Sequence, residues 1–228
     1  MDSIATRLAA VSARIRAAEA AAGRVPGSVR LVAVSKTQPA SMLAAAYRCG
    51  QRDFGENYLQ EALTKQEQLA NPDLVWHFIG PIQSNKTRPL ALHFHWVHSI
   101  DRHKIAERLN EQRPADLPPL NVTIQVNVSG EASKSGVAPA AVAELAAAVH
   151  GLPRLRLRGL MAIPEPSDDV ATQRAAFHSL RRMLEELDLA GVDQLSMGMS
   201  HDLEAAILEG ATLVRIGTAI FGARPGYR

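Results

Sequence analysis

Short apolar runs alternate with longer amphipathic segments along the chain, and this alternation predicts the fold. The apolar runs suit strands of a parallel sheet, because such strands are covered on both faces. Eight strands are predicted, at Arg30–Ser35, Arg52–Gly55, Val75–Gly80, His95–Ser99, Asn121–Asn127, Leu155–Ala162, Gln194–Met197 and Thr212–Ile216. Helical periodicity predicts helices at Asp2–Ala22, Pro39–Cys49, Glu56–Ala70, Arg102–Glu111, Pro139–His150, Val170–Leu189 and His201–Glu209.

The spacing of these elements distinguishes between two α/β architectures. The strands recur about every 20–30 residues, which is typical of βα units. Eight such units in 228 residues are close to the minimum for a closed (β/α)₈ barrel, whereas a doubly wound open sheet usually carries fewer strands at this length. We therefore predict an α/β protein, a (β/α)₈ TIM barrel with an extra N-terminal helix, and a single domain over residues 1–228.

Composition narrows the possible partners and the compartment. The chain carries 25 basic and 23 acidic residues, so its charge favours neither nucleic acid nor an anionic membrane as a partner. The one cysteine, Cys49, excludes an internal disulfide and agrees with a reducing compartment. The sequence shows neither a signal-peptide pattern nor an apolar stretch long enough to cross a bilayer. We therefore expect a cytoplasmic protein. We also expect a monomer, because no group from a second subunit is needed and no long apolar surface stripe is evident.

Lys36 stands where the first apolar run ends, and Thr37 and Pro39 follow it as turn residues. With the period of two of a strand, Lys36 points the same way as Val32 and Val34. Burial disfavours the charged form of an amine, and the neutral amine is the form that attacks a carbonyl to make a Schiff base. A lysine that extends its ammonium to solvent at a strand end is the alternative, and this stretch by itself favours that alternative.

The loops after the last two predicted strands are rich in small residues. Ser196–Ser200 precedes a predicted helix, and Arg215–Gly222 closes the last strand. Barrels of this kind bind phosphate at these two loops, through backbone N–H groups at helix N-termini. The glycines could instead serve only the turns, and Ser200 only as a helix cap, so both interpretations stay open.

A lysine on the first strand and a phosphate cradle on the last two fit pyridoxal phosphate, whose aldehyde bonds an amine while its phosphate is anchored elsewhere. Arg215 would face the ring nitrogen, where an aspartate would make the cofactor a stronger electron sink. An arginine keeps that nitrogen unprotonated. Such a site favours binding, or a narrow range of proton transfers, over broad carbanion chemistry.

Six segments resemble the pyridoxal phosphate homeostasis proteins, which are single-barrel relatives of the alanine racemase N-terminal domain. They are Leu31–Ala40, Phe54–Tyr58, Trp76–Lys86, Leu157–Pro164, Ser196–Ser200 and Val214–Arg224. The resemblance covers nearly the whole chain in the family's order. It implies an alanine racemase N-terminal domain-like barrel that binds pyridoxal phosphate covalently on Lys36. It also implies phosphate contacts from Ser200, Gly217 and Thr218, Arg215 at the ring nitrogen, and a pocket lined by Asn57, His77 and Met161. His201 departs from the family, which more often has an acidic residue there.

Three functions are compatible with these residues. The first is a protein that holds pyridoxal phosphate reversibly and maintains vitamin B6 homeostasis without robust catalysis, with apo forms of cofactor-dependent enzymes as possible recipients. The second is a small amino-acid racemase. In alanine racemases a tyrosine from a partner subunit's second domain supplies the opposing base, and we expect no such domain here. Among Tyr47, Tyr58 and Tyr227 only Tyr58 lies near a strand end. The third is a lyase that forms a Schiff base with a phosphorylated sugar.

Other candidate groups carry weaker signals. Lys86 and Lys134 follow predicted strands, where a surface role is the default. His93, His95 and His98 cluster around Trp96, but His98 does not share the face of the other two. We therefore predict no metal site.

Overall fold

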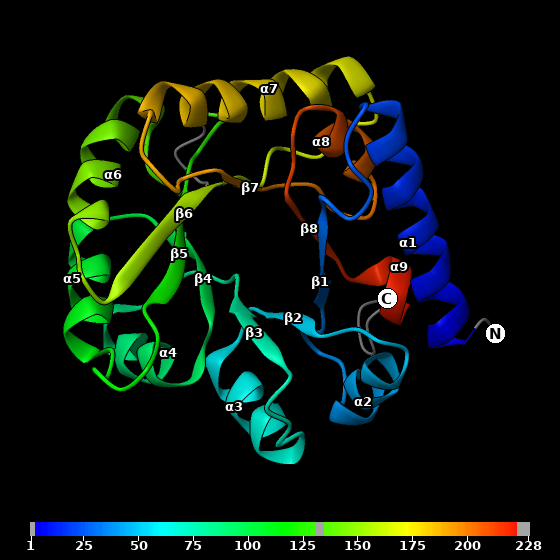
Figure 1. Ribbon diagram of the computed structural model, residues 1–228, viewed down its shortest axis with the longest axis horizontal. Helices are drawn as coiled ribbons and strands as arrows, with labels where there is room; N and C mark the ends of the chain where they lie inside the picture. Colours follow the sequence, from blue (N-terminus) through cyan, green and yellow to red (C-terminus); the bar gives the residue numbers. More distant parts are fainter. Residues whose placement is uncertain (1–2, 131–134, 223–228) are drawn as a thin grey trace.

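The computed structural model describes residues 3–130 and 135–222, so Lys134 and Tyr227 lie outside the described residues. Its core is a closed barrel of eight parallel strands in sequential order, with β1 paired to β8 (Figure 1). The strands are β1 (Arg30–Val34), β2 (Asp53–Glu56), β3 (Val75–Phe78), β4 (Trp96–Ile100), β5 (Leu120–Gln125), β6 (Leu155–Met161), β7 (Gln194–Ser196) and β8 (Leu213–Ile216). The predicted barrel is confirmed.

Helices surround the barrel (Figure 1). They are α1 (Ile4–Ala21), α2 (Ala40–Arg48), α3 (Leu59–Gln68), α4 (Thr87–His93), α5 (His103–Gln112), α6 (Val142–His150), α7 (Val170–Leu187), α8 (Leu203–Leu208) and α9 (Thr218–Phe221), with 3₁₀ turns at Ser84–Lys86 and Pro139–Ala141. The extra N-terminal helix is present: α1 buries Leu8, Val11 and Ile15, which follow the helical repeat, and packs against α2, α8 and α9.

Several element boundaries differ from the prediction. Strand β3 ends at Phe78 and β5 at Gln125, each two residues earlier than expected, because the chain turns there to form the rim of the barrel. The helix expected from Glu56 begins only at Leu59, since Glu56 is the last residue of β2. The helix expected from His201 begins at Leu203. Helix α9 was not predicted, because its single turn lies within an apolar run that reads as strand.

The barrel interior carries polar side chains. His98 on β4 contacts Ser196 on β7, and these strands are not neighbours in the sheet, so the contact crosses the interior. His77, Thr123 and Arg215 are buried with them. Branched aliphatic side chains dominate the interior of most barrels, so this polar content is unusual. The larger apolar side chains, such as Phe54 and Leu90, lie in the continuous apolar core.

Among residues 3–130 and 135–222, no helix combines the length and the apolar character needed to span a membrane.

Candidate functional site

A cavity of about 200 Å³ opens at the C-terminal ends of the strands. Six of the eight site residues expected from the sequence line it: Lys36, Asn57, Ser200, Arg215, Gly217 and Thr218. His201 lines it too. These residues come from both ends of the sequence, and they meet because β1 pairs with β8. The closure of the barrel therefore assembles the site.

Lys36 lies in a turn two residues after β1 ends at Val34, because the strand ends one residue earlier than the predicted Arg30–Ser35. The residue before it is held by a buried cluster: Lys65 Nζ donates to the carbonyl oxygen of Ser35 at 2.6 Å and to Glu56 Oε1 at 2.7 Å. The Ser35 hydroxyl also donates to Glu56 Oε1, at 2.6 Å. Burial raises the pKa of Glu56, and the neighbouring Lys65 opposes that shift. This cluster fixes the backbone from which the Lys36 side chain extends.

The residue after Lys36 is held as well. Thr37 has φ +65°, a left-handed conformation that a β-branched residue rarely adopts. Its N–H donates to Glu61 Oε1 at 2.6 Å, and Glu61 in turn accepts from Lys65 Nζ. Strain of this kind persists only where surrounding contacts impose it. The turn that carries Lys36 is thus anchored to α3 on both sides.

Asn57 follows β2, the strand that pairs with β1, and lines the cavity as well. Its Oδ1 atom is buried and has no hydrogen-bond partner among the described residues. The loop after β3 packs tightly on its backbone, since a Cβ atom added at Gly80 would overlap the Asn57 carbonyl group. A buried acceptor without a partner, on a residue that lines the cavity, suits a ligand with a hydrogen-bond donor.

The loop after β7 supplies Ser200 and is tied to the N-terminal helix. Arg14 on α1 donates from Nη2 to the carbonyl oxygen of Ser200 at 3.1 Å. It also forms two hydrogen bonds with the carboxylate of Glu204, at 2.7 and 2.9 Å. Ser200 is not the helix cap, because the N-cap position of α8 is occupied by Asp202. The hydroxyl of Ser200 therefore has no capping role, and it lies in the wall of the cavity.

Gly217 and Gly198 allow close packing around the cavity. A Cβ atom at Gly217 would lie 3.2 Å from the carbonyl oxygen of Val34, the last residue of β1. Gly198 has φ +92°, and its Cβ atom would lie 2.6 Å from that of Ala206. A side chain at either position would displace a neighbouring part of the wall.

Arg215 forms the floor of the cavity and is 3% exposed. Nη1 donates to Ser196 Oγ at 2.7 Å, and Nη2 donates to the carbonyl oxygen of Ala162 at 2.9 Å. Burial lowers its pKa to about 10, so the guanidinium is charged at neutral pH. An arginine has no acceptor atom, so every polar contact that Arg215 offers the cavity is a donated hydrogen bond.

His77 and Met161 differ from the expectation that they line the pocket. Both are fully buried, and neither belongs to the wall of this cavity. His77 lies within the barrel, 2.9 Å from His98 and 2.9 Å from Asp53. Met161 is the last residue of β6 and packs beneath the rim. Two buried polar residues, Glu56 and Lys65, hold the turn that carries Lys36 but were not predicted from the sequence.

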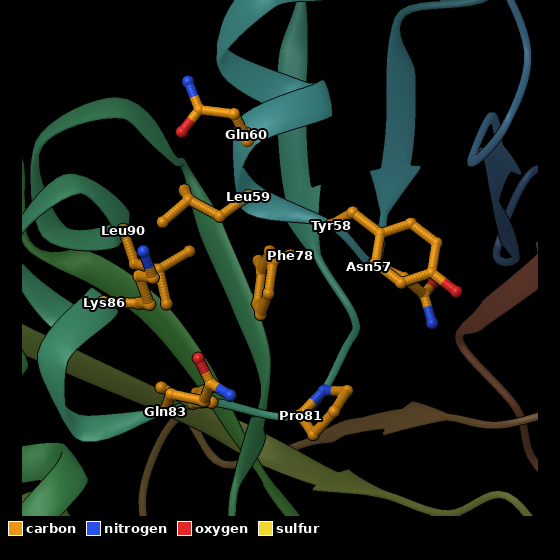
Figure 2. A pocket seen from close by; sticks show the side chains of 10 residues that line it. Asn57, Tyr58, Leu59, Gln60, Phe78, Pro81, Gln83, Lys86 and Leu90 are labelled. Atoms are coloured by element: carbon orange, nitrogen blue, oxygen red, sulfur yellow. The ribbon is translucent and has the colours of Figure 1, made fainter.

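A second cavity, of about 490 Å³, adjoins the first and shares Asn57 with it (Figure 2). It lies between the start of α3 and the loop after β3. Lys86 and Tyr58 belong to this cavity and not to the one that Lys36 lines. Tyr58, 57% exposed, therefore does not stand opposite Lys36 in a common cavity.

Comparison with known proteins places the chain in a family. Residues 6–225 match the family model described as alanine racemase, N-terminal domain. The pyridoxal phosphate homeostasis protein of Pseudomonas aeruginosa is 68% identical over 224 residues, covering 98% of this chain and 97% of that protein. PipY of Synechococcus elongatus, solved with pyridoxal phosphate bound, is 37% identical with a TM-score of 0.84, covering 96% of this chain and all of PipY. An alanine racemase from Corynebacterium glutamicum, 18% identical over 97% of this chain and 64% of its own with a TM-score of 0.69, shares the fold. The chain belongs to the family of pyridoxal phosphate homeostasis proteins, within the alanine racemase N-terminal domain superfamily of barrels.

Proposed function

We propose that this protein binds pyridoxal phosphate as a Schiff base on Lys36 and holds the cofactor reversibly for vitamin B6 homeostasis. The main observation behind this proposal is that one cavity is lined by Lys36, the buried Arg215, and the hydroxyl-bearing residues Ser200 and Thr218. Lys36 and Arg215 carry basic groups, and the hydroxyl groups of Ser200 and Thr218 can donate hydrogen bonds. Such a set of groups suits an anion that bears an aldehyde. The relatives named for pyridoxal phosphate homeostasis support this assignment.

The residues of the cavity would contact the cofactor at four points. The Lys36 amine would bond the aldehyde carbon, which is the chemistry that the cofactor supplies when bound. Ser200, Gly217 and Thr218, which line the cavity together, would hold the phosphate through hydroxyl and backbone N–H groups. Arg215 would donate a hydrogen bond to the ring nitrogen, because its own remaining hydrogens can only be donated. Asn57 Oδ1 offers an acceptor to a cofactor hydroxyl.

A holding function agrees better with this cavity than racemisation does. Two-base racemisation needs an acid–base group on each face of the bound substrate. Within residues 3–130 and 135–222, no tyrosine lines the cavity, and Tyr58 lies beside the neighbouring one. An arginine at the ring nitrogen also weakens the cofactor as an electron sink. We infer that any catalytic activity is weak.

Borohydride reduction tests the proposal directly. The purified protein is incubated with excess pyridoxal phosphate, reduced, and digested for peptide mass mapping of its five lysines. We expect a pyridoxyl adduct on Lys36, lost in Lys36→Ala and kept in Lys86→Ala, the matched control in the adjacent cavity. An adduct on another lysine would move the site. Absence of any adduct would overturn the cofactor assignment and favour a lyase acting on a phosphorylated substrate.

Delivery of cofactor to other proteins is the second part of the proposed function. The cavity lies at the C-terminal rim of the barrel, and we expect the cofactor to enter and leave there. The test mixes the loaded protein with an apo-enzyme that depends on pyridoxal phosphate and follows recovery of that enzyme's activity. Recovery faster than from the same concentration of free cofactor indicates direct transfer. Equal rates would indicate release into solution.

A further inference from the structure

Four hydrogen bonds connect the cavity to the far end of the barrel. Arg215 Nη1 lies 2.7 Å from Ser196 Oγ, which lies 2.7 Å from His98 Nδ1. His98 Nε2 lies 2.9 Å from His77 Nδ1, and His77 Nε2 lies 2.9 Å from Asp53 Oδ1. Arg215 lines the cavity at the C-terminal end, whereas Asp53 is the first residue of β2, at the N-terminal end. We call these four residues beyond Arg215 the interior chain.

The groups at the two ends of the interior chain decide in which direction its hydrogen bonds run. Arginine can only donate, so Ser196 Oγ accepts at one end. An ionised aspartate can only accept, so His77 donates from Nε2 at the other end. If both histidines are neutral, His77 Nδ1 must accept from His98 Nε2, and His98 Nδ1 must accept from the Ser196 hydroxyl. One arrangement satisfies every group: each residue donates to the next, from Arg215 toward Asp53.

The surroundings keep both histidines neutral. His77 and His98 have no exposed surface, and burial lowers the pKa of each, well below its usual value in the case of His98. Asp53 raises the pKa of His77, but less than burial lowers it. Two further charged groups face the ends: Arg30 Nη1 lies 3.4 Å from Asp53 Oδ1, and Asp202 raises the pKa of Arg215. Neither group changes the direction of hydrogen-bond donation along the interior chain, because arginine still only donates and an ionised aspartate still only accepts.

We propose that Ser196, His98, His77 and Asp53 are positioning residues that lock Arg215 as a donor toward the ring nitrogen of bound pyridoxal phosphate. The carboxylate of Asp53 orients the tautomers of both histidines, and these orient the Ser196 hydroxyl so that its oxygen accepts from Arg215. The guanidinium is thereby held in one plane, with its other hydrogens toward the cavity. This inference rests on the proposed function, because it assigns Arg215 to the ring nitrogen.

Histidine NMR on the cofactor-free protein tests the hydrogen-bond direction of the interior chain. Protein labelled with ¹⁵N-histidine is examined between about pH 8 and pH 6, around the ordinary histidine pKa. His77→Gln and His98→Gln each remove one set of signals and so assign the two rings. We expect both rings to be neutral with the proton on Nε2 throughout. A proton on Nδ1 of either ring, or a charged ring at pH 6, would contradict the hydrogen-bond direction proposed for the interior chain.

A variant at the far end tests the link to the cofactor. Asp53→Asn keeps the size of the side chain but allows it to donate, so the tautomer of His77 is no longer imposed. We expect the dissociation constant for pyridoxal phosphate to rise about tenfold. We expect the absorption spectrum of bound cofactor to be insensitive to pH near neutrality in the wild type and to become pH-dependent in the variant. Asp73→Asn, at an exposed aspartate in the loop before β3, should match the wild type.

The outcomes separate the two levels of inference. If the wild type forms no Lys36 adduct, the proposed function fails, and with it the link to the ring nitrogen, whatever the tautomers are. If the adduct forms but Asp53→Asn binds with unchanged affinity and spectrum, the positioning role is overturned while the proposed function stands. If Asp53→Asn does not fold, the wild-type tautomers still decide the polarity of the chain.

Discussion

The ammonium of Lys65 donates a hydrogen bond to the backbone carbonyl of Ser35 at 2.6 Å, so a buried lysine on α3 holds the residue that precedes Lys36. The same ammonium contacts the carboxylates of Glu56 and Glu61. Lys65 is 4% exposed and Glu56 has no exposed surface. One Glu56 oxygen, Oε2, already has no hydrogen-bond partner among the described residues. The position of the proposed attachment site therefore depends on a buried ion pair.

Lys65→Met should destabilise the protein strongly. The substitution leaves the buried Glu56 carboxylate without its counter-charge, and removing one partner of a buried pair costs about 3–5 kcal/mol of unfolding free energy. Urea unfolding measures the change. Lys104→Met, at an exposed lysine of α5, is the matched control and should stay within about 0.5 kcal/mol of the wild type. Equal stability of the two variants would show that the ion pair contributes little.

Gly80→Ala should disturb the Asn57 side of the cavity. The added Cβ atom overlaps the Asn57 carbonyl group, so the backbone of one loop has to move. Overpacking of this kind costs about 1–3 kcal/mol, and displacement of Asn57 should also weaken binding of pyridoxal phosphate. Thermal unfolding and a cofactor titration measure the two effects.

Gly151→Ala provides the control for that change. Gly151 follows α6, and a Cβ atom there would meet only ordinary van der Waals contacts, at 3.7 and 3.8 Å. Its stability and cofactor affinity should equal those of the wild type. If Gly80→Ala behaves like Gly151→Ala in both measurements, the tight packing on Asn57 is not important for the site.

The buried histidine His98 predicts a pH dependence of stability with a defined sign. Burial lowers its pKa in the folded protein, whereas the unfolded chain takes up a proton near pH 6.5. Its contribution is therefore fully present above about pH 6.5 and is lost as the pH falls toward the folded pKa. The slope of unfolding free energy reaches about 1.4 kcal/mol per pH unit for one proton.

His98→Gln isolates this contribution. Glutamine keeps one donor and one acceptor for its neighbours but binds no proton. The slope of the unfolding free energy between about pH 6.5 and pH 5 should therefore fall by up to about 1.4 kcal/mol per pH unit, the value for one proton. Urea unfolding at several pH values gives the slopes. His93→Gln, at an exposed histidine, should retain the wild-type slope. An unchanged slope in His98→Gln would mean that the pKa of His98 is not lowered in the folded state.

Arg14→Gln should weaken phosphate binding without unfolding the barrel. Arg14 connects α1 to the Ser200 carbonyl and to Glu204, and these side chains are about 40–50% exposed, so the loss of stability should be below about 1 kcal/mol. We expect the dissociation constant for pyridoxal phosphate to rise several-fold as the Ser200 loop loosens. Arg16→Gln, exposed on the same helix, should bind normally. Identical binding by both variants would exclude a role for α1 in the site.

Much of the fold follows from local patterns. Apolar runs at regular spacing predict eight parallel strands and their closure, because each strand is buried on both faces. The cavity residues at strand ends, such as Lys36 and Arg215, also follow from position, since parallel strands bring their C-terminal ends together. The ends of strands were less predictable, because the chain leaves the sheet where side-chain contacts such as those of Ser35 begin.

The interior chain was not predictable, and the reason is geometric. Together with Arg215, it joins side chains on β2, β3, β4, β7 and β8 that are up to 162 residues apart. The period of two assigns a face to His77 within its own strand but does not identify the residue opposite it. His98 illustrates this limit: from sequence it stood beside His93 and His95 as a candidate metal ligand. Among the described residues no group of three or more candidate ligands could hold a metal.

The pairing of β1 with β8 has a consequence for the synthesis of the protein. Lys36 emerges from the ribosome long before Gly217 and Thr218, and the cavity needs all three. A growing chain therefore has no complete cofactor site until the final strand docks. Binding of pyridoxal phosphate would then select finished, closed barrels over partly folded ones, and a reduced adduct would serve as a marker of correct folding in the cell.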